Sequence, residues 1–231
     1  MQIKLPSGVS ASFHARAGST MDLARSYDGA QGFPHWILAG TQSKARGRQG
    51  RSWLCPAGAF AASLVMQPRC TPAEAAQRSF VAACALRRAL SSLVGAGALA
   101  QKWPNDVLLN GGKVAGILLE SSGSGQLVDR LTIGIGVNLG PAPQDVAQAS
   151  FPPIGVADVT GESLAPEAFL AILAQSFTER LKAEGRDPSA ANDTPEDTPQ
   201  GDELPSIAGD TEDLSTTEAP EDGNATQDEH A

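Results

Sequence analysis

Two short stretches of the sequence carry residue types that could do chemistry on anions. The first, residues 44–53 (Lys-Ala-Arg-Gly-Arg-Gln-Gly-Arg-Ser-Trp), holds four cations within eight residues, and its glycines let the backbone approach a ligand closely. The second, residues 102–106 (Lys-Trp-Pro-Asn-Asp), adds a lysine and a carboxylate, and Lys113 follows soon after. Arginine binds phosphate or carboxylate through two parallel hydrogen bonds. The set is therefore suited to holding an organic acid beside a nucleotide phosphate.

Each stretch also has a simpler interpretation. The arginines could belong to a nucleic-acid-binding arm or a solvated loop, and Lys102 and Asp106 could form a surface ion pair worth about 0–1 kcal/mol. A nucleic-acid binder would interleave exposed aromatic residues with its charges, yet Trp53 is the aromatic residue near the arginines. A P-loop is excluded because the Gly-Lys-Ser/Thr ending is absent.

The elements that would position these residues follow from periodicity and capping. Helix starts are indicated at Ser19, with Asp22 three residues later, and at Thr71, which is followed by Pro72 and Glu74. We expect helices over 19–26, 71–94 and 166–181, and strands over 9–15, 36–41, 61–67 and 131–139. This content predicts an α+β domain with a mixed, mainly antiparallel sheet flanked by helices.

A hairpin is expected to bring the second stretch together with Lys113. Pro104 favours an extended Trp103, and residues 107–109 and 114–119 read as strands joined by a Gly111-Gly112 turn. The turn would return Lys113 to the end of the sheet that carries Asp106. Gly134 and Gly136 lie inside the strand 131–139, which suggests that something approaches its backbone closely.

Charge is distributed unevenly along the 231 residues. The formal charge is −9, but residues 187–231 hold 14 of the 26 acidic residues and no Lys or Arg. The body keeps 12 acidic against 17 basic residues, a formal charge of +5. We expect one domain over 1–186 and a disordered acidic tail over 187–231, because the tail has too few apolar residues to offset its ordering entropy.

The rest of the composition indicates the compartment. The three cysteines, Cys55, Cys70 and Cys84, fit no metal motif and are expected to be small core residues in a reduced cytoplasmic protein. No signal peptide is recognisable, and no apolar run reaches the roughly 20 residues that a membrane helix needs.

Four motifs together resemble one family. Residues 46–53 resemble the GRGRxGRxW loop of bacterial biotin protein ligases, and residues 102–106 their KWPND motif. Residues 113–120 (Lys-Val-Ala-Gly-Ile-Leu-Leu-Glu) and 134–139 (Gly-Ile-Gly-Val-Asn-Leu) look like two further motifs of that family. Their order and spacing match, and the resemblance extends from about Phe13 to Lys182. It implies the catalytic domain of the biotin/lipoate ligase family, a fold like that of class II aminoacyl-tRNA synthetases.

The resemblance also implies a reaction. Biotin and ATP would form biotinyl-5′-AMP with Mg²⁺ as cofactor, and a lysine of a biotin carboxyl carrier protein would then accept the biotin. A homodimer is possible. No helix-turn-helix domain precedes Phe13, so nucleic acid is not expected as a partner. A membrane is not expected either, because no apolar run is long enough to cross one.

Roles follow from the resemblance position by position. Lys113, Arg48 and Asp106 would be catalytic: Lys113 on the biotin carboxylate, Arg48 in the closing loop, and Asp106 near the incoming amine. Other positions would bind biotin's ureido ring, the adenylate or the adenine, or let the ligand lie against the backbone; these are Ser19, Thr20, Gln42, Arg46, Gly47, Trp53, Lys102, Asn105, Gly116, Gly134, Gly136 and Asn138.

Three departures from the family pattern stand out. The family usually has glycine at Ala45, where a left-handed residue would strain alanine by about 1 kcal/mol. It usually has asparagine at Met21, and a small β-barrel-like domain where the acidic tail begins. A biotin-binding sensor without ligase activity is therefore one alternative. A lipoate ligase is another, although that enzyme's usual Arg-Arg-x-Ser-Gly-Gly-Gly loop is absent.

Overall fold

A computed structural model describes residues 3–144, 146 and 150–185. The predicted acidic tail, residues 187–231, lies outside this part. Within it, the strands form one sheet in the order β1-β2-β3-β7-β6-β5-β4. The strands are β1 (Ser10–Ala17), β2 (His35–Gln42), β3 (Phe60–Met66), β4 (Leu99–Lys102), β5 (Asp106–Leu109), β6 (Gly112–Ser122) and β7 (Arg130–Val137). Among the strands of the described residues, only β1 and β2 pair in parallel, which confirms the mixed, mainly antiparallel sheet.

The helices begin and end close to where the sequence places them. They are α1 (Thr20–Arg25), α2 (Pro72–Val94), α3 (Val156–Thr160) and α4 (Pro166–Ala183), with 3-10 turns η1 (Arg48–Gly50) and η2 (Ala96–Ala98). The start of α2 is a complete capping box: the Thr71 hydroxyl accepts from the Glu74 amide at 3.3 Å, and the Glu74 carboxylate from the Thr71 amide at 2.8 Å. The helix ends at Gly95, with φ +79°.

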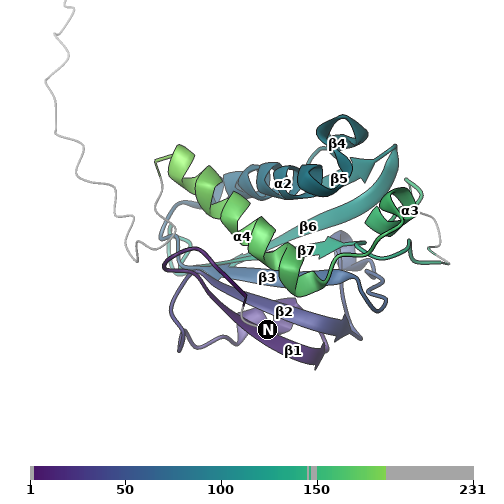
Figure 1. Cartoon of the computed structure of the whole chain (residues 1–231). Coiled ribbons are helices and arrows are strands. Elements are labelled where there is room, and N and C mark those ends of the chain that lie inside the picture. Colours follow the sequence, from purple (N-terminus) through teal and green to yellow (C-terminus); the bar gives the residue numbers. More distant parts are fainter. Residues whose placement is uncertain (1–2, 145, 147–149, 186–231) are drawn as a thin grey trace, which may run out of the picture. The chain divides into compact units, whose positions relative to one another are not determined.

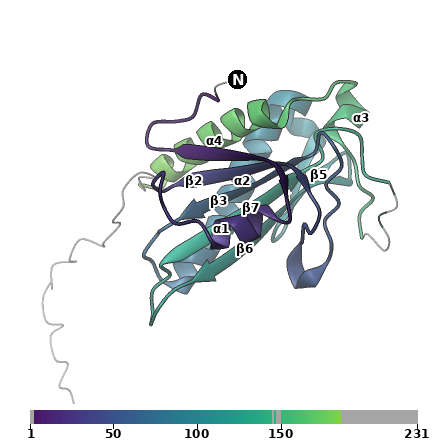
Figure 2. The same cartoon turned by 90° about the horizontal axis from the view of Figure 1, so that it is seen from below.

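Helices cover both faces of the sheet. Figures 1 and 2 show α2 and α4 on one face and α1 on the other. Successive side chains of a strand point to opposite faces. Leu64 of β3 accordingly packs in the main core beneath α2 and α4, whereas Val65 packs in a smaller cluster with Ala24 of α1. The α1 face is only partly covered, and the candidate site lies there.

Several predictions need correction. The hairpin turn is Asn110-Gly111, not Gly111-Gly112: both turn residues have positive φ, at +47° and +82°, and Leu109 pairs with Gly112. Asn-Gly is the favoured sequence for such a two-residue turn. The strand β4 and the helix α3 were not predicted, because both are short and lack clear periodicity.

The cysteines also differ from expectation. All three are half-buried, at the margin of the core rather than within it, and Cys70 packs against that core. No helix among the described residues has the length and apolar character to cross a membrane.

Candidate active site

A glycine floor lies on the α1 face of the sheet. Ile133 and Ile135 of β7 point into the core on the helix side, so the alternating Gly134 and Gly136 face the other way. Gly116 of β6 pairs directly with Gly136. A Cβ atom at Gly136 would lie 2.6 Å from the Trp53 indole, and one at Gly134 would lie 2.5 Å from Met21 Sδ. The predicted close approach is thus present, but in this structure the protein's own side chains make it.

A cleft of about 580 Å³ opens over this floor. Its volume falls within the roughly 300–1,000 Å³ of typical ligand pockets. Arg48 and Lys113, from different stretches of the sequence, line the same cleft. Every residue predicted for the site is among its lining residues: Ser19, Thr20, Gln42, Arg46, Gly47, Arg48, Trp53, Lys102, Asn105, Asp106, Lys113, Gly116, Gly134, Gly136 and Asn138.

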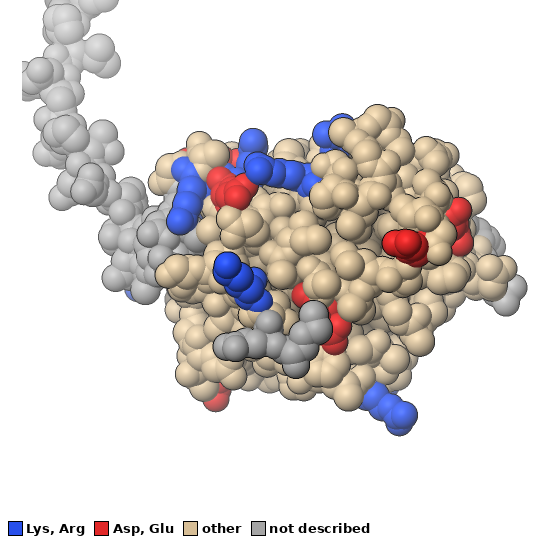
Figure 3. Space-filling view, in the orientation of Figure 1, with Lys and Arg blue, Asp and Glu red and all other residues tan. Residues whose placement is uncertain are grey.

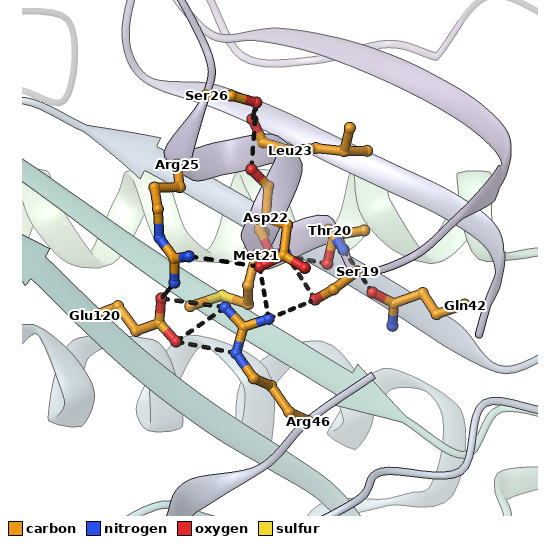
Figure 4. Close-up of polar contacts among 11 residues, drawn as sticks. Ser19, Thr20, Met21, Asp22, Leu23, Arg25, Ser26, Gln42, Arg46 and Glu120 are labelled. Carbon is orange, nitrogen blue, oxygen red and sulfur yellow. Dashed lines mark hydrogen bonds and ion pairs between the residues drawn. The ribbon is translucent and has the colours of Figure 1, made fainter. Parts of the chain in front are cut away.

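One end of the cleft presents neutral hydrogen-bonding groups. The Ser19 hydroxyl caps α1 by accepting from the Met21 amide at 3.3 Å, and it also accepts from Arg46 Nη1 at 3.3 Å. The Thr20 amide donates to Gln42 Oε1 at 2.6 Å, as Figure 4 shows. Because its oxygen accepts twice, the buried Ser19 hydroxyl keeps its own hydrogen to donate to a ligand.

The other end of the cleft is cationic. Lys113 Nζ lies 2.9 Å from Asp106 Oδ1 and 5.5 Å from the centre of a Trp53 ring. The side chain of Asp106 is 12% exposed. Lys102 Nζ instead lies 4.9 Å from the centre of the Phe151 ring. The ion pair of Asp106 is therefore with Lys113, and the interpretation of Lys102 and Asp106 as a simple surface pair is wrong.

The two arginines that come first in the loop differ in their partners. Arg48 is exposed and donates to Asn105 Oδ1 at 3.2 Å. Arg46 contacts Glu120 through Nε and Nη2 at 3.1–3.3 Å, and Asp22 Oδ1 through Nη1 at 2.8 Å. Burial opposes the charged form of Arg46, yet Asp22 and Glu120 together raise its pKa above the ordinary value. Asp22 and Glu120 had no predicted role in the site; Glu120 was visible only as the last residue of the motif 113–120.

Alanine at position 45 strains nothing. Left-handed φ values among the described non-glycine residues occur at Gln49, Arg69 and Asn110, and not at Ala45. The predicted cost of replacing the family's glycine is therefore absent.

A segment that the sequence analysis missed closes the cleft beside Lys113. The Lys113 amide donates to the Pro152 carbonyl at 2.8 Å, and the Ile154 amide to the Lys113 carbonyl at 3.1 Å. Asn138 Nδ2 donates to the Ile154 carbonyl at 3.1 Å. Asn138 Oδ1 and Trp53 Nε1 are buried without a partner among the described residues, so each could satisfy a ligand group. No local sequence signal links residues 150–154 to Lys113.

The cleft concentrates positive charge. Among its described lining residues, Arg48, Arg51, Lys102 and Lys113 stand against the single carboxylate of Asp106, while the charge of Arg46 is balanced by Asp22 and Glu120. On the helix-covered face in Figure 3, by contrast, basic and acidic side chains lie in small, mixed groups among uncharged residues. A cleft with several fixed cations and one anion favours an anionic ligand.

The family follows from comparison with known proteins. A model of the biotin/lipoate A/B protein ligase family matches residues 19–138, which include both motif stretches. The chain belongs to this family. Its fold within the family resembles that of a biotin protein ligase from Leishmania major in complex with biotinyl-5-AMP, with a TM-score of 0.63 and 26% identity over 77% of this chain and 76% of that one.

Two curated members of the biotin/lipoate ligase family show how far the similarity extends. The chain is 55% identical to a biotin–[acetyl-CoA-carboxylase] ligase of Paracoccus denitrificans over 145 residues, 62% of this chain and 60% of that protein. It is 37% identical to the bifunctional ligase/repressor BirA of Escherichia coli over 103 residues, 44% of this chain and 32% of that protein. The matched segment thus spans less than two thirds of either relative.

Proposed function

We propose that this protein ligates biotin to a lysine of a biotin carboxyl carrier protein, using ATP and passing through biotinyl-5′-AMP. One observation carries the proposal: the neutral groups of Ser19, Thr20 and Gln42 line the same cleft as the cations Arg48 and Lys113. Biotin has a neutral ureido ring at one end and a carboxylate at the other. The biotin–[acetyl-CoA-carboxylase] ligase relative and the neighbour that binds biotinyl-5-AMP support the assignment.

The ureido ring fits the neutral end. Its carbonyl oxygen would accept from the hydroxyl of Ser19, whose hydrogen is left over after the oxygen has accepted two hydrogen bonds. Thr20 and Gln42, already joined by a hydrogen bond, would engage the remaining polar atoms of the ring. Met21 and the glycine floor would contact its apolar edge.

The cations fit the first chemical step. A carboxylate oxygen of biotin attacks the α-phosphorus of ATP, the bond from that phosphorus to the bridging oxygen breaks, and pyrophosphate leaves. Two anions must meet, so fixed positive groups have to cancel repulsion and stabilise charge on the phosphoryl oxygens. Lys113 would bind the carboxylate, Arg48 would close over the adenylate, and Lys102 would add charge nearby.

The adenine would lie at the end of β7. Trp53 offers an aromatic face for stacking, and Asn138 Oδ1 is a buried acceptor without a partner in the described part of the chain. The exocyclic amino group of adenine is a donor that would satisfy Asn138 Oδ1. The floor has no side chains at Gly116, Gly134 and Gly136, which leaves space for the Trp53 indole and the ligand.

Magnesium would accompany the triphosphate. The described residues contain no group of three or more His, Cys, Asp or Glu side chains that could cage a metal ion. This donor set fits Mg²⁺ at a nucleotide, which takes most ligands from phosphate and water and one or two from carboxylates. Asp106 is the carboxylate of the cleft that could contribute. When bound, the ion would neutralise phosphate charge.

The second step transfers biotin to the carrier. The amine nitrogen of a carrier lysine attacks the anhydride carbonyl, the bond from that carbon to the phosphate oxygen breaks, and AMP leaves. Asp106 would lie near the incoming amine and compensate its developing positive charge, while Asn105 holds Arg48 beside it. A cytoplasmic location and a homodimer stay predictions.

A direct assay tests the function. Incubation of the full chain with biotin, ATP and Mg²⁺ should give biotinyl-AMP, detected by mass spectrometry, and then a biotinylated carrier. Lys182→Ala, an exposed lysine on α4 away from the cleft, is the control for charge removal. Biotin binding without biotinyl-AMP would instead establish the sensor alternative, and adenylation of lipoate in preference to biotin would establish the lipoate ligase.

A further inference from the structure

We infer that Glu120, supported by Asp22, is a positioning residue that tethers the arginine loop (residues 44–53) to the sheet through Arg46. The inference deepens the proposed function, and only its effect on biotin binding rests on that function. Glu120 lies on β6, Asp22 on α1 and Arg46 in the loop, so the three side chains join separate parts of the fold (Figure 4).

The guanidinium of Arg46 is largely occupied. Its Nε and Nη2 donate to Glu120, and its Nη1 donates to Asp22 and Ser19. An arginine has five N–H groups, so little capacity remains for a phosphate. Arg48, two residues along, donates one side-chain hydrogen bond, to Asn105 Oδ1 at 3.2 Å. We therefore assign anchoring to Arg46 and leave ligand capture to Arg48.

The loop has few other links to the sheet. Most of its backbone bonds are internal: the Gly47 amide donates to the Arg51 carbonyl at 2.7 Å, and the Trp53 amide to the Ala45 carbonyl at 3.1 Å. At its start, the Lys44 amide donates to the Gly18 carbonyl at 2.7 Å. Together with the Arg46–Ser52 bridge, the internal bonds make the loop a small self-contained hairpin. Such a hairpin can pivot as a unit unless side chains hold it, and Arg46 is the side chain with the most bonds to β6 and α1 in the described structure.

Charge balance explains why Glu120 is the main anchor. Arg25 also donates to Glu120, at 3.0 Å, so one carboxylate serves two guanidiniums. With Asp22 the four side chains sum to zero charge. Neutralising Glu120 leaves two cations facing one carboxylate, which weakens both contacts at once. The tether also reaches the neutral end of the cleft, because Arg46 donates to the Ser19 hydroxyl.

Limited proteolysis with trypsin tests the tether without any ligase activity. Lys44, Arg46, Arg48 and Arg51 are cleavage sites within the loop. Glu120→Gln should raise the cleavage rate there about tenfold, since the charged hydrogen bonds that close the loop are lost. The matched control is Glu179→Gln: Glu179 pairs with Arg88 at 2.7 Å on the helix side, and its side chain is 39% exposed against 33% for Glu120. The control should cleave at the wild-type rate.

Further measurements keep the inference open to refutation. Asp22→Asn should give a smaller rise in loop cleavage, because Glu120 remains, and Glu120→Asp should restore part of the protection. If Glu120→Gln lowers the melting temperature of the whole protein, the proteolysis comparison is replaced by hydrogen exchange of amides 44–53 in the wild type at low and high salt. Exchange should be faster at high salt, because salt screens the ion pairs of Arg46. Loop cleavage of Glu120→Gln equal to that of Glu179→Gln overturns the tether.

The binding readout separates the two proposals. Biotin affinity, measured by equilibrium dialysis, should fall severalfold in Glu120→Gln because Ser19 loses the Arg46 contact that orients its hydroxyl. Faster loop cleavage in a protein that makes no biotinyl-AMP would uphold the tether and reject the ligase. Biotinyl-AMP formation by the wild type, together with unchanged loop cleavage in Glu120→Gln, would uphold the ligase and reject the tether.

Discussion

The floor and the loop of the cleft are built in different ways. The floor lies on β6 and β7, where continuous backbone pairing runs from Ala115–Val137 to Ser122–Arg130. The loop, residues 44–53, is held to the sheet mainly by side-chain contacts of Arg46, Arg48 and Trp53. Groups on the floor are therefore fixed by backbone pairing, whereas the position of the loop depends mainly on side-chain contacts. We expect changes on the floor to alter the rate of chemistry and changes in the loop to alter retention of the intermediate.

Removing the floor's lysine should have the largest effect. Lys113→Ala should lower biotinyl-AMP formation by about 10²–10³-fold, the usual cost of losing one fixed electrostatic stabiliser. The protein should stay folded, since Lys113 is partly exposed. Pyrophosphate release measures the rate, with Lys182→Ala as control. Near-normal pyrophosphate release by Lys113→Ala would remove Lys113 from the proposed mechanism.

Adding one methyl group to the floor should be the next largest change. Gly136→Ala would place a Cβ atom 2.6 Å from the Trp53 indole, and such overpacking costs about 1–3 kcal/mol. Gly97→Ala is a matched control, because a Cβ atom there meets nothing within 4 Å. Chemical denaturation compares the two. Equal stability of Gly136→Ala and Gly97→Ala would show that Trp53 can move away from Gly136, so that its packing on the floor is not rigid.

A loop substitution should change retention more than rate. Arg48→Gly removes a cation that, as proposed, covers the adenylate, so biotinyl-AMP should leave early, with a dissociation rate about tenfold higher for each 1.4 kcal/mol lost. Free adenylate would then label exposed lysines on bystander proteins. Mixing the variant with biotin, ATP, the carrier and an unrelated protein measures this selectivity. Unchanged preference for the carrier would contradict the division between floor and loop.

Mild acid should weaken the sheet around His35. Burial and the neighbouring His14 lower the pKa of His35, which lies between the Ser10 and Ser12 hydroxyls and stacks on Tyr27. The unfolded chain then binds a proton more readily than the folded one, so stability falls as pH drops below about 6.5. Melting temperatures from pH 7.5 to 5.5 should fall by a few degrees, and His35→Gln should flatten the profile. A flat wild-type profile would contradict the prediction.

Local features made most of the fold predictable. Thr71, Pro72 and Glu74 determine the start of α2 within four residues, and Gly95 ends it, so neighbours along the chain suffice. The hairpin turn was misplaced by one residue because Gly111-Gly112 was preferred over Asn110-Gly111. The short elements β4 and α3 owe their form to packing against the rest of the domain, which periodicity does not report.

The lining of the cleft was largely predictable, but the contacts of its residues were not. The residues predicted for the site all line one cleft, although their ligand roles stay predictions. That Asp106 pairs with Lys113 rather than Lys102 depends on the register and bulge of β5 on β6. The partner of Lys102, Phe151, comes from a segment that no motif marks.

Residue type and spacing along the chain determined which groups are available. One segment supplies cations and glycines, and another supplies a lysine and a carboxylate. Two strands supply glycines where other atoms must approach the backbone closely. Those properties are covalent or local and need no fold. Only the tertiary structure decided that Arg46 is bound by Asp22 and Glu120, 24 and 74 residues away in sequence. Such pairings depend on strand order and helix placement, which bring distant side chains within hydrogen-bonding distance.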